Sequence, residues 1–182
     1  MPQKPQILSR RTVARSRLFH VEELELLFAN GARTRFERLV GSGRGAVLIV
    51  PMLDDDTVLL IREYAAGTQR YELGLPKGLV EQGEELLEAA NREIMEEVGY
   101  GARQLDYLTA LTVAPGYLSH STHVILARDL YPERLPGDEP EDIQVVPWKL
   151  SQLDQLIALD DCTEARSIAA LYMARDQLSR TA

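Results

Sequence analysis

The stretch GLVEQGEELLEAANREIMEEVGY, residues 78–100, predicts the helix around which this protein is organised. A helical segment over residues 84–98 opens with two glutamates, which suit the positive end of a helix dipole, and it stops at Gly99. On a wheel of about 100° per residue, one arc is apolar, and it holds Leu86, Leu87, Ala90, Ile94 and Val98. This arc should pack on a sheet.

The carboxylates of this segment border its apolar arc. Glu97 falls inside the arc, Glu93 lies beside it one turn earlier, and Glu96 sits at the edge. Most runs of charge are simply a solvated helix surface. Like charges three or four residues apart cost roughly 0.2–0.5 kcal/mol per pair, however, and only Arg92 offsets them here. Because carboxylates four residues apart can converge on one divalent cation, the pattern favours a metal site.

The composition narrows the choice of partners. The chain has 182 residues, of which 45% are hydrophobic and 26% charged, as expected for one folded, water-soluble domain. Its net charge is −8 and its 20 basic residues are scattered, which argues against nucleic acid or an anionic membrane as a partner. A small polyanion would need a divalent cation and a few well-placed arginines to bind such a protein.

Cysteine usage and the N-terminus indicate the compartment. Cys162 is the only cysteine, so the chain can form no internal disulfide and has no cysteine cluster for zinc. The first eleven residues contain no apolar segment of a secretion signal, and nowhere do eighteen apolar residues follow one another. We therefore expect a cytoplasmic protein.

Hydrophobic alternation predicts an α/β domain with an N-terminal β-hairpin annex. Residues 1–45 contain alternating runs on either side of Asn30-Gly31, a strong hairpin signal, and end in a flexible loop at residues 41–45. Residues 46–182 should form the main domain. Its expected strands are residues 46–50, 57–61, 107–113, 122–127 and 143–146, and its further helices are residues 151–159 and 163–178.

The central stretch also resembles a known motif. Gly78, five residues, Glu84, seven residues and then REIMEEVGY resemble the Nudix box, GX5EX7REUXEEXGU, in which U is aliphatic. Tyr100 departs from the pattern at the last position. The segments IREYAAGT and GDEPE extend the similarity to ADP-ribose pyrophosphatases and bacterial ADP-compounds hydrolases of this family. The resemblance implies an α/β/α sandwich around a mixed sheet, with the box at residues 78–100 as a loop-helix-loop.

The same resemblance implies a set of metal ligands. Glu93 and Glu97 would be the principal ligands of Mg²⁺, or of Mn²⁺, with support from Glu96. The backbone carbonyl of Lys77, just before the box, would complete the site. Arg92 would clamp the neighbouring carboxylates.

A second acidic cluster lies at residues 137–143, with the sequence GDEPEDI. Acidic loops are usually only solvated. In similar enzymes, however, a mobile acidic loop supplies the general base and one more metal contact. That resemblance suggests Glu139 as the base and Glu141 as the metal ligand.

Three residues are candidates for substrate binding. Arg62 lies in a segment similar to the (I/V)RxY segment of the subgroup, where the arginine contacts phosphate, although a surface salt bridge is equally expected for one arginine. Arg38 is a weaker candidate of the same kind. Tyr117 lies close to a tyrosine that marks dinucleoside-polyphosphate hydrolases, whereas Pro115 matches a proline of ADP-ribose hydrolases. The substrate signal is therefore mixed.

The family resemblance implies a metal-dependent hydrolase of a small nucleotide. Such an enzyme would cleave the diphosphate of ADP-ribose, NADH or diadenosine polyphosphates into AMP and a phosphorylated remainder. Related enzymes use their N-terminal strands to reach a partner subunit, so the resemblance also implies a homodimer.

Other functions remain open at this stage. A catalytically idle Nudix domain could bind an ADP-containing metabolite as a sensor, although it would have little need of so many carboxylates. Isoprenoid-diphosphate isomerisation requires a catalytic cysteine, and Cys162 lies too close to the C-terminal helix for that role. The chain lacks the G-x-x-x-x-G-K-[ST] motif of a P-loop kinase.

Overall fold

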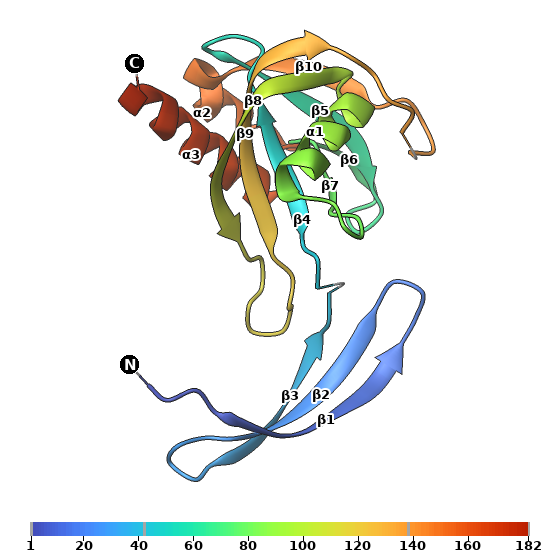
Figure 1. Cartoon of the computed structure of the whole chain (residues 1–182), viewed down its shortest axis with the longest axis vertical. Helices are drawn as coiled ribbons and strands as arrows, with labels where there is room; N and C mark the ends of the chain where they lie inside the picture. Colours follow the sequence, from blue (N-terminus) through green and yellow to red (C-terminus); the bar gives the residue numbers. More distant parts are fainter. Residues whose placement is uncertain (1, 42, 138, 182) are drawn as a thin grey trace. The chain divides into compact units, whose positions relative to one another are not determined.

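The computed structural model describes residues 2–41, 43–137 and 139–181, in two compact units (Figure 1). Residues 1–45 and 112–121 form the first unit, and residues 46–111 and 122–182 form the second. Ser42 of the predicted flexible loop and Asp138 of the predicted acidic loop lie outside the described residues.

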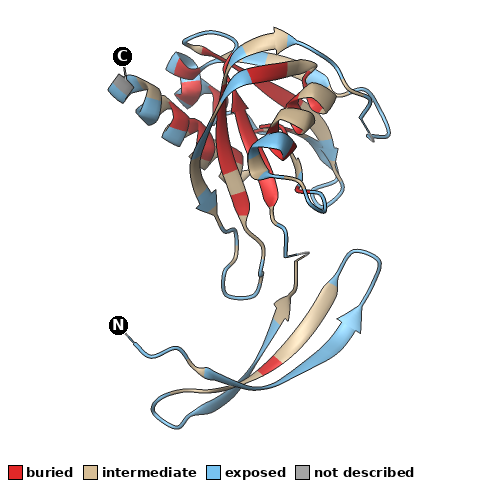
Figure 2. Ribbon diagram, in the orientation of Figure 1, coloured by how far each residue is buried: buried red, intermediate tan, exposed pale blue. Residues whose placement is uncertain are grey.

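An antiparallel three-stranded sheet makes up most of the first unit. Its strands are β1 (Gln6–Arg15), β2 (His20–Leu27) and β3 (Arg33–Leu39), in that order. The hairpin predicted around Asn30-Gly31 is confirmed, because Leu27 pairs with Arg33 and Gly31 adopts a φ of +82° in the turn. Strand β1 was not predicted. All ten of its residues are exposed, so it has no buried face to create a hydrophobic pattern (Figure 2).

Two sheets form the centre of the second unit. The larger has the order β7-β4-β9-β8, and the smaller has the order β10-β5-β6. Strands β4 and β9 run parallel and every other pair is antiparallel, so the larger sheet is mixed, as predicted. The strands are β4 (Ala46–Pro51), β5 (Thr57–Ala65), β6 (Arg70–Gly74), β7 (Lys77–Leu79), β8 (Tyr100–Leu111), β9 (Thr122–Pro132) and β10 (Gln144–Lys149).

Helices cover both faces of these strands. They are α1 (Leu86–Glu97), η1 (Leu150–Gln152), α2 (Leu153–Leu156) and α3 (Ala165–Thr181). All six residues of β4 are buried (Figure 2), and the four central ones alternate between two cores. Val47 and Ile49 join the core that contains α1, whereas Leu48 and Val50 join the core that contains α2 and α3. The predicted α/β/α sandwich is therefore confirmed.

Helix α1 is slightly shorter than the predicted segment. Glu85 is its N-cap and forms a capping box with Glu88, so the first glutamate lies before the helix. Gly99 follows the C-cap with a φ of +80°, which explains why the helix stops there. Leu87 is 39% exposed and Ala89 is fully buried, so the apolar face is rotated from the one predicted. The rotation carries Glu93 and Glu97 inward.

No helix in the described part of the chain is both long and apolar enough to cross a membrane.

Candidate active site

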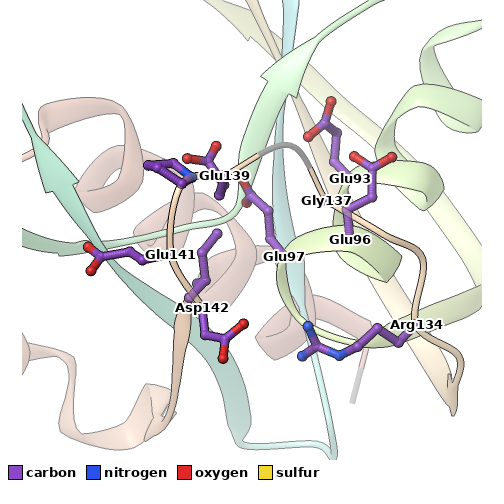
Figure 3. A pocket seen from close by; sticks show the side chains of 10 residues that line it. Glu93, Glu96, Glu97, Arg134, Gly137, Glu139, Glu141 and Asp142 are labelled. Atoms are coloured by element: carbon purple, nitrogen blue, oxygen red, sulfur yellow. The ribbon is translucent and has the colours of Figure 1, made fainter.

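A strongly acidic pocket lies between helix α1 and the segment that connects β9 to β10 (Figure 3). The helix contributes three carboxylates and the connecting segment three more, together with Arg134 at its start. These acidic residues are Glu93, Glu96, Glu97, Glu139, Glu141 and Asp142. The structure thus brings the two acidic clusters of the sequence to one place, although more than forty residues separate them.

Glu97 is the most deeply placed of these carboxyl groups. It is only 5% exposed, and its Oε2 accepts a hydrogen bond of 3.0 Å from the backbone N–H of Lys77. Burial raises the pKa of Glu97 from 4.5 to about 8, and the negative charges of Glu93 and Glu63 add to this effect. The Lys77 side chain opposes it only in part. A cation bound beside this carboxyl group would stabilise its ionised form.

Glu93, one turn before Glu97, is also buried, with an exposed fraction of 8%. Its carboxyl group packs directly against the backbone of Gly78. A Cβ at position 78 would overlap that carboxyl group, so the close approach requires glycine. The glycine that begins the box motif therefore makes room for the carboxylate that follows fifteen residues later.

Arg92 organises the helix carboxylates. Its Nε lies 2.9 Å from Glu84, and its Nη1 lies 2.7 Å from Glu93 and 3.1 Å from Glu96. Nη2 also donates to the carbonyl oxygen of Leu79, at 3.1 Å. The pKa of Glu84 is held below its usual range by Arg92. Arg92 thus contacts three carboxylates, and its role as a clamp in the reaction stays a prediction.

The acidic side chains fit a hard divalent cation in type, since Mg²⁺ and Mn²⁺ prefer oxygen ligands. Among the described residues, however, no three acidic, histidine or cysteine side chains already form a metal cage. Arg92 engages Glu93 and Glu96, and the Lys77 amide engages Glu97. Each of these three carboxylates is therefore already held by a protein group.

Lys77 lies in β7, and its backbone N–H donates to Glu97 of this pocket. Its backbone pairs with Leu48 of β4, and its Nζ forms an ion pair of 2.6 Å with Glu63. The sequence interpretation did not include Glu63. Glu63 lies two residues after Ile61 on β5. Because side chains alternate along a strand and Ile61 faces the core that contains α1, Glu63 faces the same side.

The two predicted residues of the connecting segment have different surroundings. Glu139 lines the pocket together with the helix carboxylates (Figure 3). Glu141 lines it too, but its Oε1 accepts a hydrogen bond of 2.7 Å from the hydroxyl of Tyr71 on β6. This bond raises the pKa of Tyr71. Sequence reasoning missed Tyr71, which lies seventy residues away from Glu141.

Arg62 does not join this pocket. Leu59 and Ile61 of β5 face the core of α1, whereas Val58 and Leu60 face the core of α3, so alternation places Arg62 on the α3 side. There it forms a salt bridge of 2.8 Å with Asp161. In this structure Arg62 therefore forms an ion pair, which is the alternative to the predicted phosphate contact.

Arg38 and Tyr117 meet in a pocket of the first unit. Its walls come from β2, β3 and the segment that contains Pro115, and they include Leu24 and Phe36. Arg38 is tied to Glu22 at 2.7 Å. The structure therefore groups these two predicted substrate contacts with each other.

Comparisons with known proteins agree with this geometry. The family model of the Nudix domain matches residues 43–172, and that of the N-terminal domain of NudE-type Nudix hydrolases matches residues 5–38. The chain is 51% identical to ADP compounds hydrolase NudE of Escherichia coli (strain K12), over 97% of this chain and 94% of that protein. It is 28% identical to the ADP-ribose pyrophosphatase of Bacillus subtilis (strain 168), over 90% and 91% of the two chains.

A solved structure is similar as well. The crystal structure of an ADP compounds hydrolase superimposes with a TM-score of 0.93 at 50% identity, covering 100% of this chain and 97% of that one. Nudix hydrolases generally use divalent metal ions, which fits the acidic pocket. The box motif, the sandwich fold and these similarities together show that the chain belongs to the Nudix hydrolase family.

Proposed function

We propose that this enzyme hydrolyses the diphosphate linkage of ADP-containing compounds and releases AMP and a phosphorylated remainder. The observation that carries the proposal is the meeting of the α1 carboxylates with Glu139 in one pocket. The names of the similar proteins, an ADP compounds hydrolase and an ADP-ribose pyrophosphatase, support this substrate class.

Mg²⁺ or Mn²⁺ is the cation that this site would use. Glu93 and Glu97 would hold it, with Glu96, Glu141 and the Lys77 carbonyl as further oxygen ligands. When bound, the cation offsets the charge of the diphosphate and favours ionisation of an attacking water. The burial of Glu93 and Glu97 supports their role as the principal ligands. A buried carboxylate loses its hydration, so its negative charge costs free energy unless a positive partner lies beside it.

The chain's own residues would carry the proton and hold the geometry. A water oxygen attacks one phosphorus in line, the bridging phosphorus–oxygen bond breaks, and a carboxylate oxygen of Glu139 accepts the proton of the water. Arg92 keeps Glu93 and Glu96 in their places through the reaction. Glu139 is exposed and lies in the segment between β9 and β10 that lines the pocket, from which it would approach the reacting water.

The pocket of the first unit has side chains of the kind that bind a nucleotide. Phe36 and Tyr117 offer aromatic rings for a base, and Arg38 offers a cation beside them. The pairing of Arg38 with Glu22 sets the orientation of its guanidinium group.

A homodimer is the assembly that we infer for this chain. Residues 1–45 would act as an annex that contacts the second copy, and residues 46–182 would form the catalytic domain. The first unit exposes several large apolar side chains, and in the turn between β1 and β2 Leu18 is 77% and Phe19 55% exposed. A cytoplasmic location is consistent with the buried free thiol of Cys162.

A substrate panel tests the activity. Purified protein with Mg²⁺ is incubated separately with ADP-ribose, NADH and diadenosine polyphosphates, and the AMP released is measured by chromatography. Release of AMP from at least one compound is expected. If the protein instead bound one of them in calorimetry with Mg²⁺ and released no AMP, the catalytically idle sensor would replace the enzyme.

A further inference from the structure

The acidic pocket poses an electrostatic problem for a diphosphate. Six carboxylates line it, and a substrate that carries phosphate groups must approach them. A divalent cation offsets part of this charge, but phosphate recognition in proteins usually also uses a guanidinium or ammonium group. Given the proposed function, a basic side chain of this chain should therefore be available at the pocket.

The basic residues singled out from the sequence are all engaged by carboxylates. Arg92 contacts Glu84, Glu93 and Glu96. Lys77 is paired with Glu63 at 2.6 Å. The other two arginines are Arg62, which is paired with Asp161 on the α3 side of the sheet, and Arg38, which is paired with Glu22 in the first unit.

Arg134 differs from these residues. It is one of the residues that line the acidic pocket, and it is exposed to solvent; Figure 3 shows its side chain apart from the carboxylates of Glu93 and Glu96. Within residues 2–41, 43–137 and 139–181, the structure gives its guanidinium no salt bridge and no hydrogen bond. Its N–H donors therefore remain available for a ligand.

The backbone around Arg134 is fixed against the end of helix α1. The N–H of Glu133 donates to the carbonyl of Gly99, and the N–H of Leu135 donates to the carbonyl of Met95, each at 3.2 Å. The guanidinium itself lies over Gly99, where a Cβ would come within 3.1 Å of Nε and Nη2. Arg134 is thus held at the rim of the pocket. Part of the conformational entropy that binding would remove is already lost before any substrate binds.

We propose that Arg134 is a substrate-binding residue that contacts the phosphate groups of the ADP-containing substrate. A planar guanidinium at this position can donate two parallel hydrogen bonds to one phosphate while the α1 carboxylates hold the cation. Gly99 then has two roles, since it ends helix α1 and leaves the space in which the guanidinium lies. The inference rests on the proposed function and adds a residue outside the box motif.

The experiment compares Arg134→Gln and Arg134→Lys with the wild type and with Arg103→Gln as a matched control. Arg103 is an exposed arginine of β8 that pairs with Asp129 and does not line the pocket. With ADP-ribose and Mg²⁺, Arg134→Gln should raise KM by about tenfold or more, as expected for loss of a charged hydrogen bond. Arg134→Lys should recover part of the loss, and Arg103→Gln should behave as the wild type.

A second readout separates substrate binding from a structural role. Calorimetry with Mg²⁺ alone should give Arg134→Gln an affinity equal to or higher than that of the wild type, because a positive charge near the carboxylates has been removed. An unchanged KM would overturn the proposal, as would a rise in KM together with a loss of Mg²⁺ affinity and of melting temperature. The wild-type protein tests the proposed function separately. If it released AMP from no ADP compound, the proposed function would be wrong, whatever the Arg134 variants did.

Discussion

The carboxyl group of Glu93 fills the space that a side chain at position 78 would occupy. Gly78 begins the box motif and Glu93 lies in the third turn of helix α1, so one contact joins the two ends of the motif. A buried carboxylate pressed against a backbone has few alternative positions. The orientation of Glu93 toward the pocket is therefore set by a glycine.

The first prediction follows from this contact. Gly78→Ala should displace Glu93 and reduce both Mg²⁺ affinity and kcat/KM, the latter by about tenfold or more, because small displacements at a reacting centre are costly. Calorimetry and AMP release measure the two effects. Gly67→Ala is the control, since a Cβ at position 67 meets nothing within 4 Å. Wild-type kinetics for Gly78→Ala would show that the contact is unimportant.

The raised pKa of Glu97 predicts a pH effect on the stability of the metal-free protein. The folded state keeps a proton on Glu97 up to a pKa of about 8, whereas the unfolded chain releases it near 4.5. This contribution to stability is complete below pH 4.5 and is lost as pH rises through 8. Gln resembles the protonated group, so Glu97→Gln should melt at a higher temperature than wild type at pH 8–9 in chelator.

The same pair of proteins should melt alike near pH 4.5, where both side chains are neutral. Glu81→Gln, an exposed substitution close to the same helix, should melt at the same temperature as the wild type at both pH values. Differential scanning calorimetry across this pH range provides the measurement. A lower melting temperature for Glu97→Gln at pH 9 in chelator would contradict the assigned burial effect.

Glu139→Gln tests the general base. A base of this kind typically contributes about 10²–10⁴-fold, so kcat should fall by about that factor while KM and Mg²⁺ affinity change little. Glu141→Gln should weaken the response to Mg²⁺ as well, although its bond with Tyr71 must be broken for Glu141 to reach a cation. Should both substitutions leave the kinetics unchanged, Glu96 or Glu97 would have to accept the proton.

The N-terminal sheet predicts the oligomeric state. Multi-angle light scattering at micromolar concentration should give twice the 20.4 kDa mass of one chain. Phe19→Ser, in the exposed turn between β1 and β2, should shift the equilibrium toward the monomer because less apolar surface is buried on association. A mass of 20.4 kDa for the wild type would refute the dimer.

The sequence predicts those parts of the site that a single helix determines. The period of an α-helix fixes which side chains share a face, so the residue pattern alone places Glu93 and Glu97 at the inward face and Arg92 beside them. The mixed sheet and the two helical layers follow from the family resemblance and from the long buried strands. The exposed strand β1 escapes prediction because it has no apolar face.

The remaining parts of the site depend on contacts between distant segments. Strand β5 is buried on both faces, so its sequence does not show that Arg62 faces α3 and Glu63 faces the opposite side, where it pairs with Lys77. Tyr71 acquires its role only when β6 meets the segment after β9, and Arg134 only when that segment is brought to helix α1. Nothing in their local sequence distinguishes them from ordinary surface residues.

The central claim is that carboxylates of helix α1 hold a divalent cation that the hydrolysis requires. The most direct measurement is the rate of AMP release from the best compound of the substrate panel, as free Mg²⁺ is raised from excess chelator to saturation. No release is expected in chelator, full recovery is expected with Mg²⁺, and Glu97→Gln should be at least about a hundredfold slower at saturating Mg²⁺. Full activity of the wild type in excess chelator, or of Glu97→Gln with Mg²⁺, would contradict it.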